Sequence, residues 1–173
     1  MSILPGHIRQ IGYVVDDLDR AITRWVQLGV GPWFVMRGLS VRALYRGEPC
    51  EVTQSIALSN SGDLQVELIQ QDDDTPSIFT EFLSTRREGF HQVAYWATDY
   101  DAAIAAVREA GWATVWSGGE GLGVRFAYLQ PPDSPVEVVE ISELTDTVAA
   151  MGTVIRDAAA GWDGSDPVRV LGG

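Results

Sequence analysis

The sequence predicts an α+β fold made of two copies of one unit, in which a strand and a helix are followed by three more strands. An internal repeat is the first observation: residues 10–22 (QIGYVVDDLDRAI) return as residues 92–104 (QVAYWATDYDAAI), a constant step of 82 positions. Gly29 and Gly111, which follow the two helical stretches, keep the same step. The order of the remaining expected elements is also the same in both halves. Two long copies indicate a duplicated unit, because a solenoid needs at least three short repeats.

The first half begins with a strand, since residues 7–15 alternate between two faces with the two-residue period of an extended chain. Asp17 or Asp19 can then accept hydrogen bonds from the first N–H groups of a helix, whose apolar stripe has helical spacing. Gly29 is expected to end this helix. Three further strands are expected near 29–36, 52–58 and 64–69, with an arginine-rich hairpin or loop at 37–52.

The second half follows a bridging stretch at 71–89, in which we expect a short helix at 77–84. Its own elements are expected at 91–98 (strand), 100–110 (helix), 113–117, 124–130 and 136–142 (strands). Residues 144–160 are predicted to form an additional helix, followed by an irregular tail. We therefore predict one domain at 1–143, with units at about 6–70 and 90–143 joined by a linker at about 71–89, and a C-terminal extension at 144–173.

The composition limits the classes of function. A net charge of −12 and a pI of about 4.4 argue against a nucleic-acid partner, which requires clustered Lys and Arg. Cys50 is the single cysteine, so an internal disulfide is excluded and a reducing compartment is favoured. The sequence shows no apolar run of membrane-spanning length and no signal-peptide pattern. We therefore expect a cytoplasmic protein that does not bind membranes.

A family resemblance rests on the repeated pattern of a strand, V-x-D-L-x-x-A (residues 15–21), a helix and three more strands. This pattern resembles the vicinal oxygen chelate superfamily of glyoxalases, methylmalonyl-CoA epimerases, extradiol dioxygenases and bleomycin-resistance proteins. The resemblance covers about residues 6–143, and residues 121–143 are most similar to the last hairpin of the epimerase branch. It implies two βαβββ modules that form a curled mixed sheet around one cavity. Members often form dimers, and the sequence leaves a homodimer open.

The resemblance also implies four ligand positions that face the cavity from the first and fourth strands of each module. They match Gln10, Glu67, Gln92 and Glu140, so that both expected histidines are glutamines. Two carboxylates and two amide oxygens suit Mg²⁺, Mn²⁺ or Ca²⁺ better than Zn²⁺. The alternative is a cavity without metal, in which the glutamines form hydrogen bonds with the carboxylates or with a ligand.

The two histidines of the chain do not take over these positions. His7 and His91 are separated by 84 positions, so they are not equivalent in the repeat. Because His91 precedes Gln92 directly, a regular strand sends the two side chains to opposite faces, and His91 is expected to face the helices. A bulge would instead turn His91 into the cavity, where it joins the catalytic candidates.

Carboxylates and aromatic side chains are the remaining candidates for the cavity. Burial and like charge are expected to raise the pKa values of Glu67 and Glu140, so that one acts as general base and the other as general acid. The alternative is that each carboxylate only pairs with a nearby Gln or Arg. Aromatic side chains expected to contact a flat or apolar ligand are Trp33, Trp96, Phe126 and Tyr128.

Two functions follow from this resemblance. The first is an isomerase, epimerase or lyase in which Glu67 and Glu140 transfer protons, Trp96 packs on the substrate, and the glutamines orient it or complete a weak metal site. The second is a binding protein that holds an aromatic drug or metabolite without turnover, as bleomycin-resistance proteins do. The replaced histidines favour the second function, whereas the two glutamates favour the first, because an apolar binder has no reason to bury charge. An extradiol dioxygenase is disfavoured, since its iron site needs two histidines and one carboxylate.

Overall fold

The computed structural model describes residues 2–171. In this range the elements are β1 (Gln10–Val14), α1 (Leu18–Gln27), β2 (Trp33–Tyr45), β3 (Glu48–Ser61), β4 (Leu64–Gln71), α2 (Ile78–Thr85), β5 (Gly89–Ala97), α3 (Tyr100–Glu109), β6 (Ala113–Gly118), the 3₁₀ turn η1 (Glu120–Leu122), β7 (Phe126–Gln130), β8 (Val138–Glu143), α4 (Asp146–Ala160) and β9 (Val168–Val170). The predicted α+β class is confirmed.

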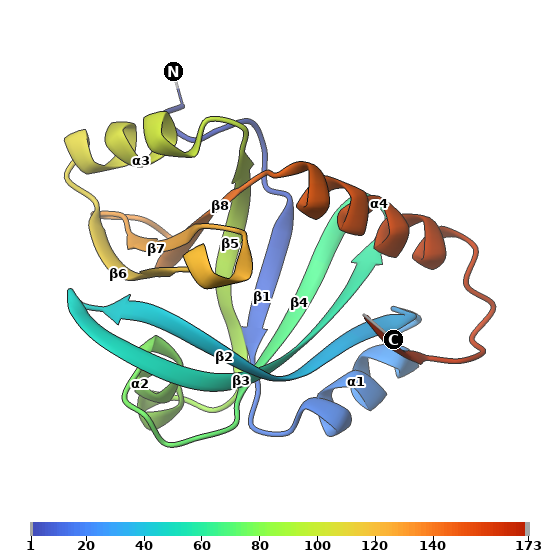
Figure 1. Cartoon of the computed structure of the whole chain (residues 1–173). Coiled ribbons are helices and arrows are strands. Elements are labelled where there is room, and N and C mark those ends of the chain that lie inside the picture. Colours follow the sequence, from blue (N-terminus) through green and yellow to red (C-terminus); the bar gives the residue numbers. More distant parts are fainter. Residues whose placement is uncertain (1, 172–173) are drawn as a thin grey trace.

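The strands form one mixed sheet that closes on itself (Figure 1). Its order is β3-β4-β1-β5-β8-β7-β6-β2-β9, and β2 also pairs with β3, so that the first eight strands make a ring. Pairing of β2 with β6 at residues 43–45 joins the two halves on the side away from β1 and β5. The expected curled sheet around a cavity is thereby confirmed.

Strand register shows the twofold relationship between the repeats. Across β1 and β5, Gly12 pairs with Gln92 and Gln10 pairs with Ala94, and exchanging each residue for its counterpart 82 positions away gives the same two pairs. In the parallel pairs, Glu67 lies beside Gly12 and Glu140 lies beside Ala94. The two glutamates therefore occupy equivalent positions, each next to a residue with a small side chain or none.

Two helices cover the outer face of the sheet, one in each repeat. Asp17 accepts a hydrogen bond from Arg20 N at the start of α1, and Asp99 accepts one from Ala102 N at the start of α3. Of the two expected capping residues, Asp17 is therefore the one used. Buried side chains of α1 pack against Tyr13 and its outward-facing neighbours, which leaves the other side of each strand for the interior of the ring.

Helices α2 and α4 do not pack on the outer face of the sheet. From α2, Phe79 and Phe82 enter the interior of the ring. In α4, Ile155 is fully buried against Phe34 and Leu58, so this helix lies across β2 and β3 (Figure 1). None of the helices within residues 2–171 combines the length and the apolar composition that crossing a bilayer requires.

The C-terminal tail differs from the expectation of an irregular segment. Residues 168–170 form β9, which pairs in parallel with residues 33–35 of β2. Trp162 contacts Gly31, where an added Cβ would come within 2.6 Å of the indole ring. A strand of three residues has no sequence pattern of its own, and β9 exists because the edge of β2 offers unpaired backbone groups.

Candidate functional site

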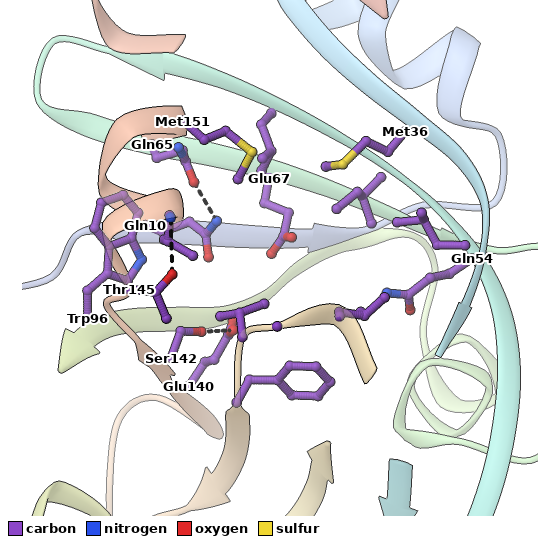
Figure 2. Close-up of a pocket in the computed structure, with 18 of the residues that line it drawn as sticks. Gln10, Met36, Gln54, Gln65, Glu67, Trp96, Glu140, Ser142, Thr145 and Met151 are labelled. Carbon is purple, nitrogen blue, oxygen red and sulfur yellow. Dashed lines mark hydrogen bonds between the residues drawn. The ribbon is translucent and has the colours of Figure 1, made fainter. Parts of the chain in front are cut away.

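The interior of the ring contains a cavity of about 320 Å³. Figure 2 shows most of the residues around it. The lining residues are Gln10, Met36, Leu39, Gln54, Ile56, Leu58, Gln65, Glu67, Phe79, Trp96, Trp116, Leu122, Gly123, Val124, Phe126, Tyr128, Glu140, Ser142, Thr145, Thr147, Val148 and Met151. Most of this wall is apolar, which makes its few polar groups candidates for chemistry or recognition.

Glu67 and Glu140, here named the carboxyl pair, are joined by the amide of Gln92. The Nε2 atom of Gln92 lies 3.4 Å from Glu67 Oε2 and 3.3 Å from Glu140 Oε2. The same atom lies 3.3 Å from the hydroxyl of Tyr128. A buried NH₂ group thus bridges two carboxyl groups that come from β4 and β8, on either side of β1 and β5.

The two members of the carboxyl pair have different environments. Burial, with the charge of Glu140, raises the pKa of Glu67 well above its ordinary value. Burial also raises the pKa of Glu140, but hydrogen bonds from Ser142, Gln92 and Tyr128 oppose that rise. The bond from Ser142 Oγ to Glu140 Oε1 is 2.5 Å long. Because donors stabilise the charged form, Glu140 is the member of the pair that ionises more readily, and Glu67 holds a proton more strongly.

His91 lies in the interior and orients Gln92. The pairing of β1 with β5 shifts register between Gly12 and Tyr13, which is a bulge. The side chain of His91 consequently packs against Phe79 and Phe82 of α2, and the expectation that it faces the outer helices is wrong. It is also not among the residues that line the cavity.

The ring nitrogen Nδ1 of His91 lies 2.6 Å from Gln92 Oε1. Burial lowers the pKa of His91, which favours the neutral imidazole. A neutral ring with its proton on Nδ1 donates to Oε1 and leaves the NH₂ group of Gln92 directed at the carboxyl pair. His91 thus contacts the Gln92 amide and does not line the cavity, so it reaches the carboxyl pair through that amide.

Gln10 does not join the other three expected ligand positions. Its Nε2 atom donates to Gln65 Oε1 over 2.8 Å, as Figure 2 shows. Within residues 2–171, no three His, Cys, Asp or Glu side chains gather in a way that could hold a metal ion. Gln92 presents hydrogens, not its oxygen, to the carboxyl pair. This donor arrangement does not suit a divalent cation, which would require the Gln92 amide to turn over.

The predicted aromatic residues are divided between cavity and core. Trp96, Phe126 and Tyr128 line the cavity. Trp33 does not: it is fully buried against Trp25 of α1, and its indole N–H donates to Val30 O over 2.9 Å. The expectation that Trp33 contacts a substrate is wrong, because α1 covers the face of β2 on which this side chain lies.

Several residues of the site were missed by sequence reasoning. Gln65 shares the inward face of β4 with Glu67, and a two-residue step from Glu67 would have found it. Ser142 follows Glu140 by the same step. The wall of the cavity is completed at the start of α4 by Thr145, Thr147, Val148 and Met151. No sequence signal placed this helix over the cavity, because its position depends on contacts with β2 and β3.

Comparisons with known proteins agree with the fold. The family model described as Glyoxalase/Bleomycin resistance protein/Dioxygenase superfamily matches residues 9–128. The methylmalonyl-CoA epimerase of Mycobacterium tuberculosis has a similar structure, with 22% identity, a TM-score of 0.61, and coverage of 86% of this chain and 94% of the epimerase. A hypothetical protein from Bacillus halodurans C-125 matches with 20% identity, a TM-score of 0.62, and coverage of 81% and 95%.

A third similar structure is a Streptomyces coelicolor methylmalonyl-CoA epimerase in complex with 2-nitronate-propionyl-CoA. It has 20% identity, a TM-score of 0.59, and coverage of 81% of this chain and 95% of the epimerase. Identities of this size establish the fold and leave the reaction to be argued from the site. No protein with a curated description matches the sequence.

Proposed function

Because the chain belongs to the Glyoxalase/Bleomycin resistance protein/Dioxygenase superfamily, we propose that it is an isomerase or epimerase that moves a proton at a carbon next to a carbonyl group. One observation carries this proposal: a carboxyl pair at equivalent positions of the two repeats, bridged by a single amide inside an apolar cavity. The fold shared with methylmalonyl-CoA epimerases supports it.

The proton transfer uses the difference between the two glutamates. Glu140, ionised, removes the proton from the substrate carbon, and the electron pair of the broken C–H bond moves into the C–C–O system as an enolate. Glu67, protonated, then delivers its proton to the other face of that carbon. Raised pKa values bring both groups nearer to neutral pH, where acid–base catalysis is efficient. The next turnover starts with the roles reversed, or after proton exchange with solvent.

The enolate oxygen needs a hydrogen-bond donor, and the cavity wall beside the carboxyl pair offers the hydroxyl of Tyr128. Burial raises the pKa of Tyr128 well above its ordinary value, so its hydroxyl stays protonated. The NH₂ group of Gln92 is fully buried and does not line the cavity, so its contribution is to the carboxyl pair that it contacts. Fixed donors in a site that excludes water stabilise developing charge more than solvent does.

A binding protein for aromatic drugs or metabolites is the second candidate. Trp96, Trp116 and Phe126 give the cavity an aromatic wall, which favours this alternative. The enzyme and the binding protein differ in one measurable property, the exchange of ligand hydrogens with solvent. A binder leaves the hydrogens of its ligand in place, whereas the proposed enzyme exchanges them with solvent.

Hydrogen exchange in D₂O separates these functions. The protein would be incubated with a panel of small chiral ketones and 2-substituted thioesters, and deuterium at the carbon next to the carbonyl would be followed by NMR. We expect exchange with at least one class and no exchange by the Glu67→Gln/Glu140→Gln double variant. Gln27→Leu, a substitution of an exposed residue on α1, is the control that should keep full activity. Binding of a panel member without exchange would establish the second candidate and reject the first.

A further inference from the structure

We infer that Gln54 recognises the substrate, and that the substrate is an uncharged, largely apolar carbonyl compound with a hydroxyl or similar hydrogen-bonding group away from the reacting carbon. The inference that this molecule reacts at a carbonyl group rests on the proposed function. The recognition of its other end rests on separate observations at Gln54. Figure 2 shows Gln54 reaching into the cavity from the side opposite Gln10 and Trp96, with Glu67 between them in this view.

The side-chain oxygen of Gln54 has no hydrogen-bond partner among the described residues, although the residue itself is only half-buried in the cavity wall. Gln54 belongs to β3, where its backbone pairs with Leu39 and Gln71. Its side-chain oxygen is itself buried. Buried polar groups in native proteins are nearly always hydrogen-bonded. In this structure the oxygen is covered by protein, so a ligand gives it a partner when the amide turns towards the cavity that Gln54 lines.

The surroundings of Gln54 in the cavity wall are mostly apolar, and its polar partner on β4, Gln71, uses its own amide on residues 73–77. Its neighbours along the inward face of β3 are Ile56 and Leu58, and Leu39 is its partner on β2. A leucine at position 54 would extend this apolar wall and would leave no polar group without a partner. By contrast, the other two lining glutamines, Gln10 and Gln65, are bonded to each other.

The charge of the cavity wall determines which class of ligand the cavity can bind. Among the described residues, the cavity lining contains no Arg, Lys or His. Within residues 2–171, its only acidic side chains are the carboxyl pair and the phenol of Tyr128. An anionic group inside would be repelled and would lack a counter-ion. Arg9 does not line the cavity; its guanidinium lies 4.8 Å from a ring centroid of Trp96. We therefore assign the cavity to the uncharged part of a substrate.

The size of the cavity agrees with this assignment. A volume of about 320 Å³ is at the small end of the range for ligand sites, which is roughly 300–1,000 Å³. A space of this size fits a ring with a short ketone chain, with its carbonyl near the carboxyl pair and its far substituent near Gln54. A nucleotide-bearing carrier would have to remain outside.

The test compares three series of phenylalkanones with one to three methylene groups between the ring and the carbonyl: unsubstituted, 4-hydroxy and 4-carboxy. Binding is measured by quenching of tryptophan fluorescence, because Trp96 and Trp116 line the cavity. For at least one chain length, we expect the wild-type protein to bind the 4-hydroxy compound about 10-fold to 100-fold more tightly than the unsubstituted one. The 4-carboxy compounds should not bind.

Gln54→Leu should remove this preference, with hydroxy and unsubstituted compounds binding within about threefold of each other. Its melting temperature should equal or exceed that of the wild type, because an unpaired amide has been removed. Gln27→Leu should keep the preference. The inference is overturned by equal binding of both series to the wild type, by a preference that survives in Gln54→Leu, or by failure of all phenylalkanones to bind.

Deuterium exchange measured in the same samples separates this inference from the proposed function. A preference for the hydroxyl group that depends on Gln54, without exchange, would support the recognition and reject the reaction. Exchange without such a preference would support the reaction and reject the recognition.

Discussion

The amide of Gln92 occupies the space that a side chain at position 12 would need. A Cβ on Gly12 would lie 2.1 Å from Gln92 Nε2 and 2.3 Å from its Cδ, far inside contact distance. Because Gly12 has no side chain, the Gln92 amide of β5 lies across β1 and reaches both members of the carboxyl pair.

Gly12→Ala should therefore disturb the site more than the fold. The methyl group displaces the Gln92 amide, and loss of this donor to the carboxyl pair should lower the exchange rate on the order of 100-fold, because acid–base catalysis by the pair is disturbed. Crowding should cost about 1–3 kcal/mol in the free energy of unfolding. Gly89→Ala on β5 is the matched control, since an added Cβ there meets nothing within 4 Å. Equal activity of the two variants would show that Gln92 is not held by Gly12.

His91→Phe tests the orientation of Gln92 with little change in ring volume. Without the Nδ1 proton, the Gln92 oxygen loses its donor and the NH₂ group is no longer fixed on Glu140. Since that bond lowers the pKa of Glu140, the pKa should rise and the acidic limb of the pH–rate profile should move to higher pH. The rate should fall about 10-fold, as for loss of roughly 1.4 kcal/mol of transition-state stabilisation. His7→Phe, at an exposed position, should leave the profile unchanged.

The stability of the protein should depend on pH through Glu67. The folded state raises the pKa of this group well above the ordinary value of 4.5, so between that value and the raised pKa the folded state holds a proton that the unfolded state has released. Stability should therefore fall as pH increases through this window. Glu67→Gln should unfold at higher denaturant concentration than the wild type at pH 8, with a smaller difference at pH 4. A Glu67→Gln variant that is less stable at pH 8 would contradict the raised pKa.

Met151→Ala tests whether α4 limits the size of the ligand. Met151 lies in this helix and lines the cavity, so its truncation should enlarge the space and shift the preference towards longer phenylalkanones. Val154→Ala, which changes a largely exposed side chain of the same helix, is the control. The relative exchange rates of the longest and shortest exchanging compounds measure the effect. An unchanged ratio would show that α4 does not determine specificity.

The duplicated fold followed from the sequence because the repeat itself is a local pattern, and the register of β1 with β5 preserves its step of 82. The positions of Glu67 and Glu140 required the resemblance, since neither stands out by residue type. The orientation of His91 was not predictable, because the bulge arises between strands that are far apart in the sequence. The burial of Trp33 likewise depends on the position of α1. Gln54 was missed because nothing in a strand assigned at 52–58 indicates which of its faces is inward.

The most direct test of the carboxyl pair uses a chiral compound that the wild type both exchanges and racemises. Each enantiomer would be incubated in D₂O with Glu67→Gln and, separately, with Glu140→Gln, and deuterium incorporation and configuration would be followed by chiral chromatography and mass spectrometry. If each glutamate serves one face, each variant should exchange only one enantiomer, the two variants should choose opposite enantiomers, and neither should invert it. Inversion by either single variant, or exchange of the same enantiomer by both, would contradict the account.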